Sequence, residues 1–176
     1  TSAYSIYALK CVLLPDVPNN EGNTLPFDVT APEGCFLNPR YPAAVEARAT
    51  VGHYSTSAIF NTLALALPDK VPAESGIPLH GFAVRGQRNG RMAAGIFFFN
   101  GGLGARADAD GISTMSFPTN VSNTPVEVLE RTFPLRFHEK SLLSDSGGSG
   151  RYHGGLGQRV VMETLGDAPV TLVLLS

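Results

Sequence analysis

The chain has 176 residues and a formal net charge of −2, with 43% hydrophobic and 16% charged residues. This composition is typical of a folded globular protein and excludes a disordered chain. The length suits a single domain, residues 1–176. The 13 Lys and Arg residues form no basic block, which argues against a nucleic-acid-binding surface. Every apolar run is far shorter than the ~20 residues that span a bilayer, so we expect no membrane segment.

Cys11 and Cys35 are the two cysteines of the sequence. They make neither a disulfide framework nor a CxxC metal pair, and this sparse usage favours a reducing compartment such as the cytoplasm. A single bridge between them is the alternative. The sequence opens at Thr1 without Met and closes on the apolar stretch "PVTLVLLS", so we expect a fragment of a longer polypeptide.

Two helices are expected in the first half of the chain. The stretch "TSAYSIYALKCVLLP" (1–15) offers Thr1 or Ser2 as an N-cap and stops at Pro15. Its expected apolar face consists of Tyr4, Tyr7, Cys11 and Leu14. The stretch "HYSTSAIFNTLALALP" (53–68) predicts a second helix, capped by Ser55 or Ser57. Its core-facing residues are expected to be Ile59, Phe60, Leu63 and Leu67.

Between these helices the sequence indicates less regular structure. Six prolines within residues 15–42 predict an extended, structured loop. The stretch "YPAAVEARATV" (41–51) predicts a strand that starts near Ala43.

The second half has the patterns of strands. Candidates are "HGFAVRG" (80–86), "RMAAGIFFFN" (91–100), "PVEVLERTFPLRFHEK" (125–140), "LGQRVVMETL" (156–165) and "PVTLVLL" (169–175). The Asn-Gly pair in "RNGR" (88–91) predicts a hairpin between the first two. Helices followed by strands indicate an α+β fold with a mostly antiparallel or mixed sheet and two or so helices in the first half.

Two glycine-rich stretches interrupt the strands, "GGLGARADADG" (101–111) and "DSGGSGRYHGGLG" (145–157). Neither has the Lys-Ser/Thr pair of a Walker A loop, and neither leads from a strand into a clear helix as a dinucleotide-binding turn does. Tight turns and bulges between strands explain each run best. The alternative is a nest of backbone N–H groups for an anion, with Arg106 or Arg151 adding charge.

The sequence offers no local metal site or nucleophile motif. The four histidines are widely separated, and Asp108 and Asp110 lack the Glu that closes an EF-hand loop, since position 119 is Thr. G-x-S-x-G is missing as well. Asn120 and Asn123 are best explained as an Asx-type turn, and a substrate-facing amide pair is the alternative.

Five stretches taken together resemble the hydantoinase B family. In chain order they are "NPRYPAAVEAR" (38–48), "ALPDKVPAES" (66–75), "GGLGARADADG" (101–111), "TNVSNTPVEVLERTFPL" (119–135) and "DSGGSGRYHGGLGQ" (145–158). The family includes N-methylhydantoinase B, the second half of ATP-dependent 5-oxoprolinase, and related subunits of acetone and acetophenone carboxylases. Each motif is weak alone, but their order over nearly the whole chain is specific.

The resemblance implies a fragment of a longer hydantoinase B-type subunit. Such a subunit works in an ATP-dependent enzyme on cyclic amides of the N-methylhydantoin or 5-oxoproline class, or on ketones. It implies that ATP use belongs to a hydantoinase A-type partner, and that ATP and a divalent metal serve the complete enzyme while this fragment binds neither. The family usually has Arg where this chain has His153, and small polar residues and Asn where it has "GIPLHGF" (76–82).

Two hypotheses follow. In the first, the chain is a catalytic-subunit fragment whose pocket is lined or braced by Arg106, Asp110, Asn120, Asn123, Asp145 and Arg151. In this view Asp145 and Arg151 pair to hold their loop. In the second, the chain is a structural or subunit-interface domain without catalytic residues of its own. Convergence of the two glycine loops on one concave site, with Arg106 and Asp145 pointing inward, favours the first hypothesis. Loops at opposite ends of the sheet favour the second.

Overall fold

The structure is a computed structural model that describes residues 2–76, 80–165 and 168–175. The chain divides into two compact units, Thr1–Glu74 and Ser75–Ser176, whereas its length predicts a single domain. Helices belong mainly to the first unit and antiparallel sheets to the second, which confirms the expected α+β class. No helix in the described part of the chain is long and apolar enough to cross a membrane.

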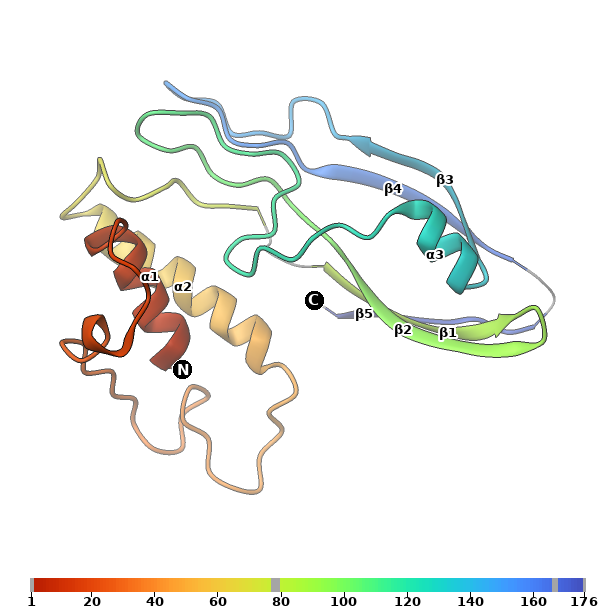
Figure 1. The fold of residues 1–176 in the computed structure, drawn as a ribbon, viewed down its shortest axis with the longest axis horizontal. Helices are drawn as coiled ribbons and strands as arrows, with labels where there is room; N and C mark the ends of the chain where they lie inside the picture. Colours follow the sequence, from red (N-terminus) through yellow and green to blue (C-terminus); the bar gives the residue numbers. More distant parts are fainter. Residues whose placement is uncertain (1, 77–79, 166–167, 176) are drawn as a thin grey trace. The chain divides into compact units, whose positions relative to one another are not determined.

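The first unit consists of two helices and a long loop. Helix α1 (Ser2–Leu13) and helix α2 (Arg48–Ala64) pack together, and the loop between them contains one 3-10 turn, η1 (Glu21–Asn23) (Figure 1). The Thr1 cap lies outside the described residues. The strand predicted near Ala43 is wrong, because residues 43–47 carry no strand and α2 already begins at Arg48.

The buried side of the helix pair combines small residues with a few larger ones. In α1 the buried residues are Ser5, Ala8 and Val12, so the predicted face of Tyr4, Tyr7, Cys11 and Leu14 is displaced by one position. In α2 the buried residues are Gly52, His53, Thr56 and Phe60. The predicted N-caps of α2, Ser55 and Ser57, are also wrong. They lie inside the helix, whose N-cap Ala47 makes no side-chain hydrogen bond.

At Gly52 of α2 the Tyr4 ring of α1 packs directly against the helix backbone. A Cβ atom at this position would lie 2.3 Å from the Tyr4 ring. The ring also meets the buried imidazole of His53 edge to face, with centroids 5.8 Å apart. His53 is 3% exposed and its Nε2 atom has no hydrogen-bond partner. Burial lowers the pKa of His53 from its ordinary 6.5, because the charged imidazolium is poorly solvated there.

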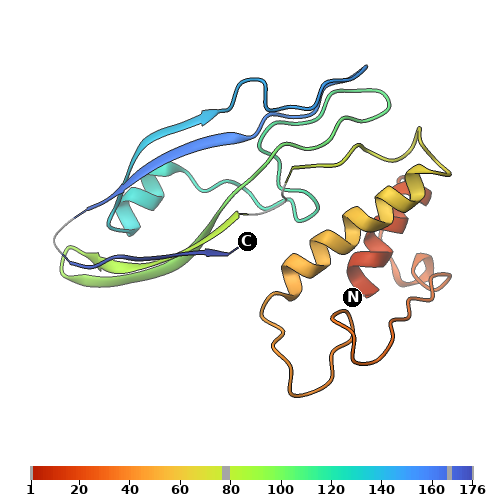
Figure 2. The same ribbon diagram turned by 180° about the vertical axis from the view of Figure 1, so that it is seen from behind.

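The second unit contains two antiparallel sheets. Strands β1 (His80–Arg88), β2 (Arg91–Phe99) and β5 (Thr171–Leu175) form the first sheet in the order β2-β1-β5. Strands β3 (Leu135–Leu142) and β4 (Gln158–Thr164) form the second, with a register shift between Phe137 and Glu139. Figure 2 shows the same two layers from behind.

The predicted hairpin at residues 88–91 is confirmed. Arg88 pairs directly with Arg91, and both turn residues have positive φ, 50° at Asn89 and 74° at Gly90. These angles are those of the tight turn that Asn-Gly favours.

Residues 125–140 form a helix and then a strand, instead of one strand. Helix α3 (Val126–Thr132) has Glu127 in its first turn and Arg131 in its last, both favourable to the helix dipole. The sequence reading is wrong here because Val126 and Val128 alternate as in a strand. Leu129, which faces the core, is 3% exposed and Val128 is 50% exposed.

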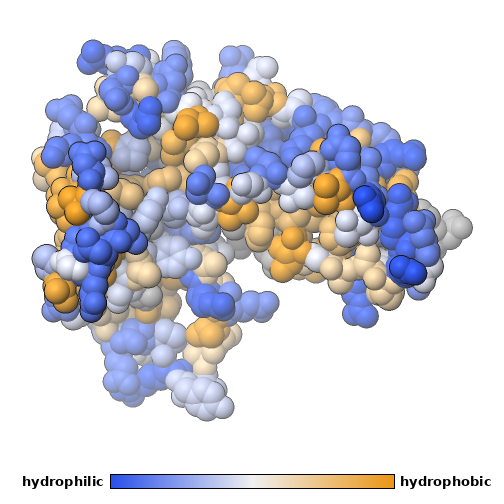
Figure 3. Space-filling model, viewed as in Figure 1, coloured by the Kyte–Doolittle hydropathy of each residue, from blue (hydrophilic) through white to orange (hydrophobic). Residues whose placement is uncertain are grey.

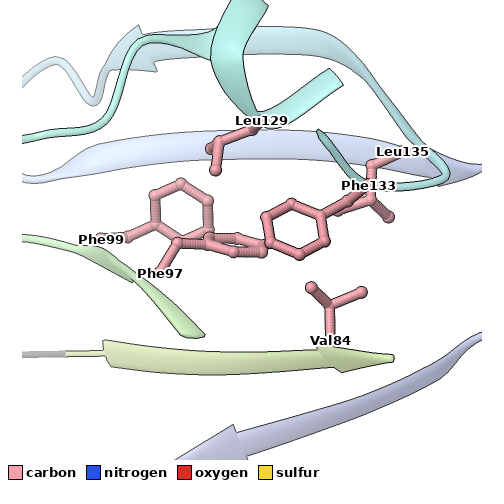
Figure 4. Packing of buried hydrophobic residues seen from close by; sticks show 6 residues of the cluster. All are labelled: Val84, Phe97, Phe99, Leu129, Phe133 and Leu135. Carbon is pink, nitrogen blue, oxygen red and sulfur yellow. The ribbon is translucent and has the colours of Figure 1, made fainter. Parts of the chain in front are cut away.

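An aromatic core joins the two sheets and α3. Its buried members are Val84, Phe97, Phe99, Leu129, Phe133 and Leu135 (Figure 4). The Phe97 ring lies 5.5 Å from the Phe99 ring and 5.8 Å from that of Phe133, within the range of favourable ring contacts. Outside this core, apolar side chains remain exposed, including Leu172, Val173 and Leu174 of β5. Orange and tan side chains are accordingly visible among blue ones on the surface in Figure 3.

We predict that Gly52→Ala destabilises the helix pair by about 1–3 kcal/mol, because overpacking against Tyr4 outweighs the gain in helix propensity. Urea unfolding measures this change. In a Tyr4→Ala background the same substitution should be neutral or stabilising. An equal loss in both backgrounds would contradict the steric explanation.

The pKa of His53 predicts acid sensitivity. Because the folded-state pKa is lowered, the unfolded chain binds the proton first as the pH falls. The free energy of unfolding should be constant above the ordinary pKa of 6.5 and should decrease below it until the folded-state pKa is passed. Urea unfolding between about pH 8 and pH 5 tests this, with His53→Phe as the matched control. Parallel pH curves for the two proteins would show that His53 is not the cause.

Candidate functional site

Three chain segments of the second unit, residues 101–104, 111–114 and 153–157, come together beyond the end of β2. We call them the glycine cluster. The Leu103 N–H donates to the Ile112 carbonyl (2.9 Å), and the Gly155 N–H donates to the Leu103 carbonyl (2.8 Å). The Gly111 N–H donates to the His153 carbonyl (2.7 Å). Each segment is thus hydrogen-bonded to both others, and the two glycine loops of the sequence converge.

Only glycine allows the segments to approach this closely. A Cβ on Gly102 would lie 1.8 Å from the Gly155 carbonyl oxygen, and one on Gly155 would lie 2.1 Å from the Ile112 oxygen. Both distances are far below van der Waals contact, and the obstructing atoms belong to backbone that cannot rotate away. The glycine runs are therefore required by packing between segments far apart in sequence.

Four side chains tie the cluster together through backbone N–H groups. The Asp110 carboxylate accepts from the His153 N–H (2.7 Å), and the Ser113 hydroxyl accepts from the Leu156 N–H (3.0 Å). The Ser146 hydroxyl accepts from the Gly157 N–H (2.9 Å), and the Ser75 hydroxyl accepts from the Gly104 N–H (3.1 Å). Bonds of this kind fix loop conformation and leave the neighbouring exposed side chains available to a ligand.

Asn100 is a buried polar residue at the junction of β2 and the cluster. It is 2% exposed, and its Oδ1 atom has no hydrogen-bond partner. Its backbone carbonyl accepts from the Gln158 side-chain amide (2.9 Å). A buried acceptor without a partner is costly, and such groups concentrate at functional sites. Sequence reasoning missed Asn100, although a polar residue between the apolar "GIFFF" and a Gly-Gly pair marks the position.

The six residues predicted from the sequence lie on or near the glycine cluster. Asp110 connects the two loops, as described above. Asn123 donates from its amide to the Thr114 carbonyl (3.4 Å), so it reaches the end of the 111–114 segment. Asn120 has φ 52° and donates its N–H to the Ser116 carbonyl (2.6 Å), and it precedes α3, whereas the sequence analysis expects a turn before a strand.

The charged residues among the six are exposed. Arg106 lies 3.8 Å from the Asp108 carboxylate. Arg151 lies over the ring of Tyr152, 5.5 Å from its centroid, and Asp145 has φ 59°. The expected pairing of Asp145 with Arg151 is absent from the ion pairs of the described residues. The two loops converge, as the first hypothesis expects, while the side chains of Arg106 and Asp145 are exposed.

His153 takes part in the glycine cluster through its backbone. Its N–H binds Asp110 and its carbonyl binds Gly111, while its side chain is exposed. Among all the described residues, no three His, Cys, Asp or Glu side chains gather closely enough to hold a metal ion.

We predict that Gly155→Ala unfolds or rearranges the glycine cluster, at a cost of about 3 kcal/mol or more, because the new Cβ would overlap the Ile112 carbonyl. Gly148→Ala is the matched control in the same loop, since nothing lies within 4 Å of its Cβ position. Amide hydrogen exchange at Leu103 and Leu156 measures the change. Similar protection in the two variants would contradict the packing explanation.

Comparisons with known proteins identify a family with this sequence and fold. The model of the family described as hydantoinase B/oxoprolinase matches residues 1–176. The chain is 37% identical over 179 residues to an uncharacterized protein of Methanocaldococcus jannaschii, covering 98% of this chain and 30% of that protein. It is 30% identical over 160 residues to the B component of a putative D-/L-hydantoinase from a Pseudomonas species, covering 90% of this chain and 27% of that protein.

Two further comparisons agree. The chain is 30% identical over 178 residues to 5-oxoprolinase 1 of Arabidopsis thaliana, covering 100% of this chain and 13% of that protein. The nucleotide-free structure of acetone carboxylase superposes with a TM-score of 0.77 at 21% identity, over 96% of this chain and 24% of that one, so the fold is shared. The chain thus spans less than a third of the length of these relatives. With its family model matched from end to end, the chain belongs to the hydantoinase B/oxoprolinase family.

Proposed function

We propose that the chain is part of an ATP-dependent enzyme that opens cyclic amide bonds of the N-methylhydantoin or 5-oxoproline class. The observation that carries this proposal is the convergence of the two glycine loops into one cluster, joined by the hydrogen bond that the His153 N–H donates to the Asp110 carboxylate. Relatives named as a hydantoinase component and as 5-oxoprolinase support the substrate class. The structurally similar acetone carboxylase carries out ATP-dependent acetone carboxylation, which agrees with ATP use.

In this proposal the glycine cluster acts as a rigid support for a pocket completed by the rest of a hydantoinase B-type subunit. Asp110 and Asn123 brace the loops, and the exposed Arg106, Asn120 and Arg151 face the substrate. Guanidinium and amide groups suit a cyclic amide, since they donate to its carbonyl oxygens and to the oxyanion that forms when the carbonyl is attacked. Asp145, which has φ 59°, shapes the loop beside Arg151.

Other components of the enzyme complete the reaction. ATP is used by a hydantoinase A-type partner, and ATP and a divalent metal are bound outside this chain. Both cysteines are free, Cys11 exposed and Cys35 partly so, which supports the cytoplasm as the compartment. The alternative is an interface domain. It is supported by the exposure of the predicted charged side chains, and it expects changes at Arg106 or Arg151 to impair subunit assembly and not turnover.

The test is an assay of the complete subunit with its hydantoinase A-type partner on 5-oxoproline, N-methylhydantoin and acetone, each with and without ATP. We expect ATP-dependent ring opening of one cyclic amide and none by the isolated 176-residue chain.

Asp110→Ala should lower kcat/KM of the complete enzyme about tenfold or more, because the loss of its charge-assisted hydrogen bond misplaces the loop. His153→Arg should leave activity within about twofold, since only the backbone of His153 makes contacts in the cluster.

Three results would overturn the proposal. Turnover of acetone alone would favour a ketone carboxylase, and ring opening by the isolated chain would contradict the dependence on a partner. Full activity of Arg106→Ala and Arg151→Ala together with weakened assembly would favour the interface domain.

A further inference from the structure

A hollow of ≈ 680 Å³ lies at the hairpin end of β1 and β2, beside the end of α3. It belongs to the second unit alone, at the opposite end of β2 from Asn100 and the glycine cluster (Figure 1). The residues that line it are Arg88, Asn89, Arg91, Met92, Ala93, Ala94, Arg131 and Thr132. The proposed function uses none of these residues.

Three arginines line this hollow, and no carboxylate of the described residues forms an ion pair with them. Arg88 and Arg91 lie directly opposite each other in the hairpin register, and like charges so placed repel. Arg131 adds a third charge from the last turn of α3. The ion pairs found among the described residues involve Arg40, Arg106, His138 and Arg159, and none of these three.

The Arg88 side chain also has a hydrogen-bond donor without an acceptor. Its Nε atom is buried and has no partner in the structure, and an unpaired donor of a charged group is costly to bury. The carboxylate of Glu130, which precedes Arg131 in the sequence, accepts a hydrogen bond from the Phe137 N–H (2.6 Å). An anion inside the hollow would satisfy Arg88 and relieve its repulsion with Arg91.

We propose that this hollow binds a small molecule carrying a phosphate group. Its volume lies within the roughly 300–1,000 Å³ of small-ligand sites. A phosphate group has three terminal oxygens and about two negative charges, so it can accept hydrogen bonds from three guanidinium groups at once. A carboxylate has two oxygens in one plane and one charge, and it leaves one arginine unpaired.

The arrangement favours a compact anion over an acidic protein segment. The three arginines come from two separate elements, the hairpin and α3, and line the same hollow. A segment extended along β2 would instead need positive charges spaced along that strand, and β2 has Arg91 as its one basic residue.

The direct test is calorimetric titration of the 176-residue chain with inorganic pyrophosphate at about 50 mM salt, where screening is weak. We expect saturable binding of one pyrophosphate per chain. Arg91→Gln and Arg131→Gln should each weaken it about tenfold or more, as expected for the loss of a charge-assisted hydrogen bond. NMR should show a shift of the Arg88 Nε–H signal on titration, which a remote site would not produce.

Arg85→Gln is the matched control. Arg85 lies on β1, is exposed and does not line the hollow, yet its substitution removes the same charge. It should change the affinity less than about twofold. Circular dichroism of each variant checks that the fold is kept.

Several outcomes would overturn the proposal. They are no binding of pyrophosphate, an equal loss in Arg85→Gln, or tighter binding of citrate or of a tetraglutamate peptide. Glycerol 3-phosphate serves as a second probe. If glycerol 3-phosphate binds as tightly as pyrophosphate, the ligand is a phosphate monoester. If it binds more weakly, the ligand is a diphosphate. Both ligands belong to the proposed class.

Discussion

The close approach of backbone segments in the glycine cluster is the constraint on which the candidate site depends. The carbonyl oxygen of Gly155 occupies the space that a side chain on Gly102 would need, and that of Ile112 does the same for Gly155. Glycine costs roughly 0.5–1 kcal/mol in backbone entropy relative to alanine. That cost is offset here by hydrogen bonds between segments that no other residue type would permit. The result is a closely packed layer of backbone, and polar side chains such as Asp110 and Ser113 bind its N–H groups.

The aromatic core fixes the end of β2, from which the glycine cluster continues. Phe97 and Phe99 hold the end of β2 against Phe133, at the C-terminal end of α3, and against Leu135 of the other sheet. Asn100 follows directly and is buried with an unpartnered Oδ1 atom. The order along β2 therefore runs from the arginine-lined hollow, through the packed aromatic rings, to the glycine cluster. One strand positions two polar regions of different chemistry at its two ends.

Short-range signals were the reliable part of the sequence. The Asn-Gly turn was predicted correctly because its positive φ angles are decided within two residues. Helix α3 was missed because Val126 and Val128 favour a strand locally, while burial of Leu129 in the core favours the helix. The start of α2 was misplaced because no side chain caps it. The buried face of α1 was displaced because helices in close contact bury small residues such as Ser5 and Ala8, and a search for large apolar residues passes over them.

By itself the sequence determined the α+β class, the hairpin and the membership suggested by five ordered motifs, since these follow from local pattern and from motif order. It also identified the glycine loops and the six candidate residues around them. Only the tertiary structure decided that the loops meet, that Asp110 binds the backbone of His153, and that Asp145 and Arg151 do not pair. The same holds for Asn100 and for the three arginines of the hollow. Contacts between residues some 40 positions apart depend on how the sheets pack, and no local pattern encodes that packing.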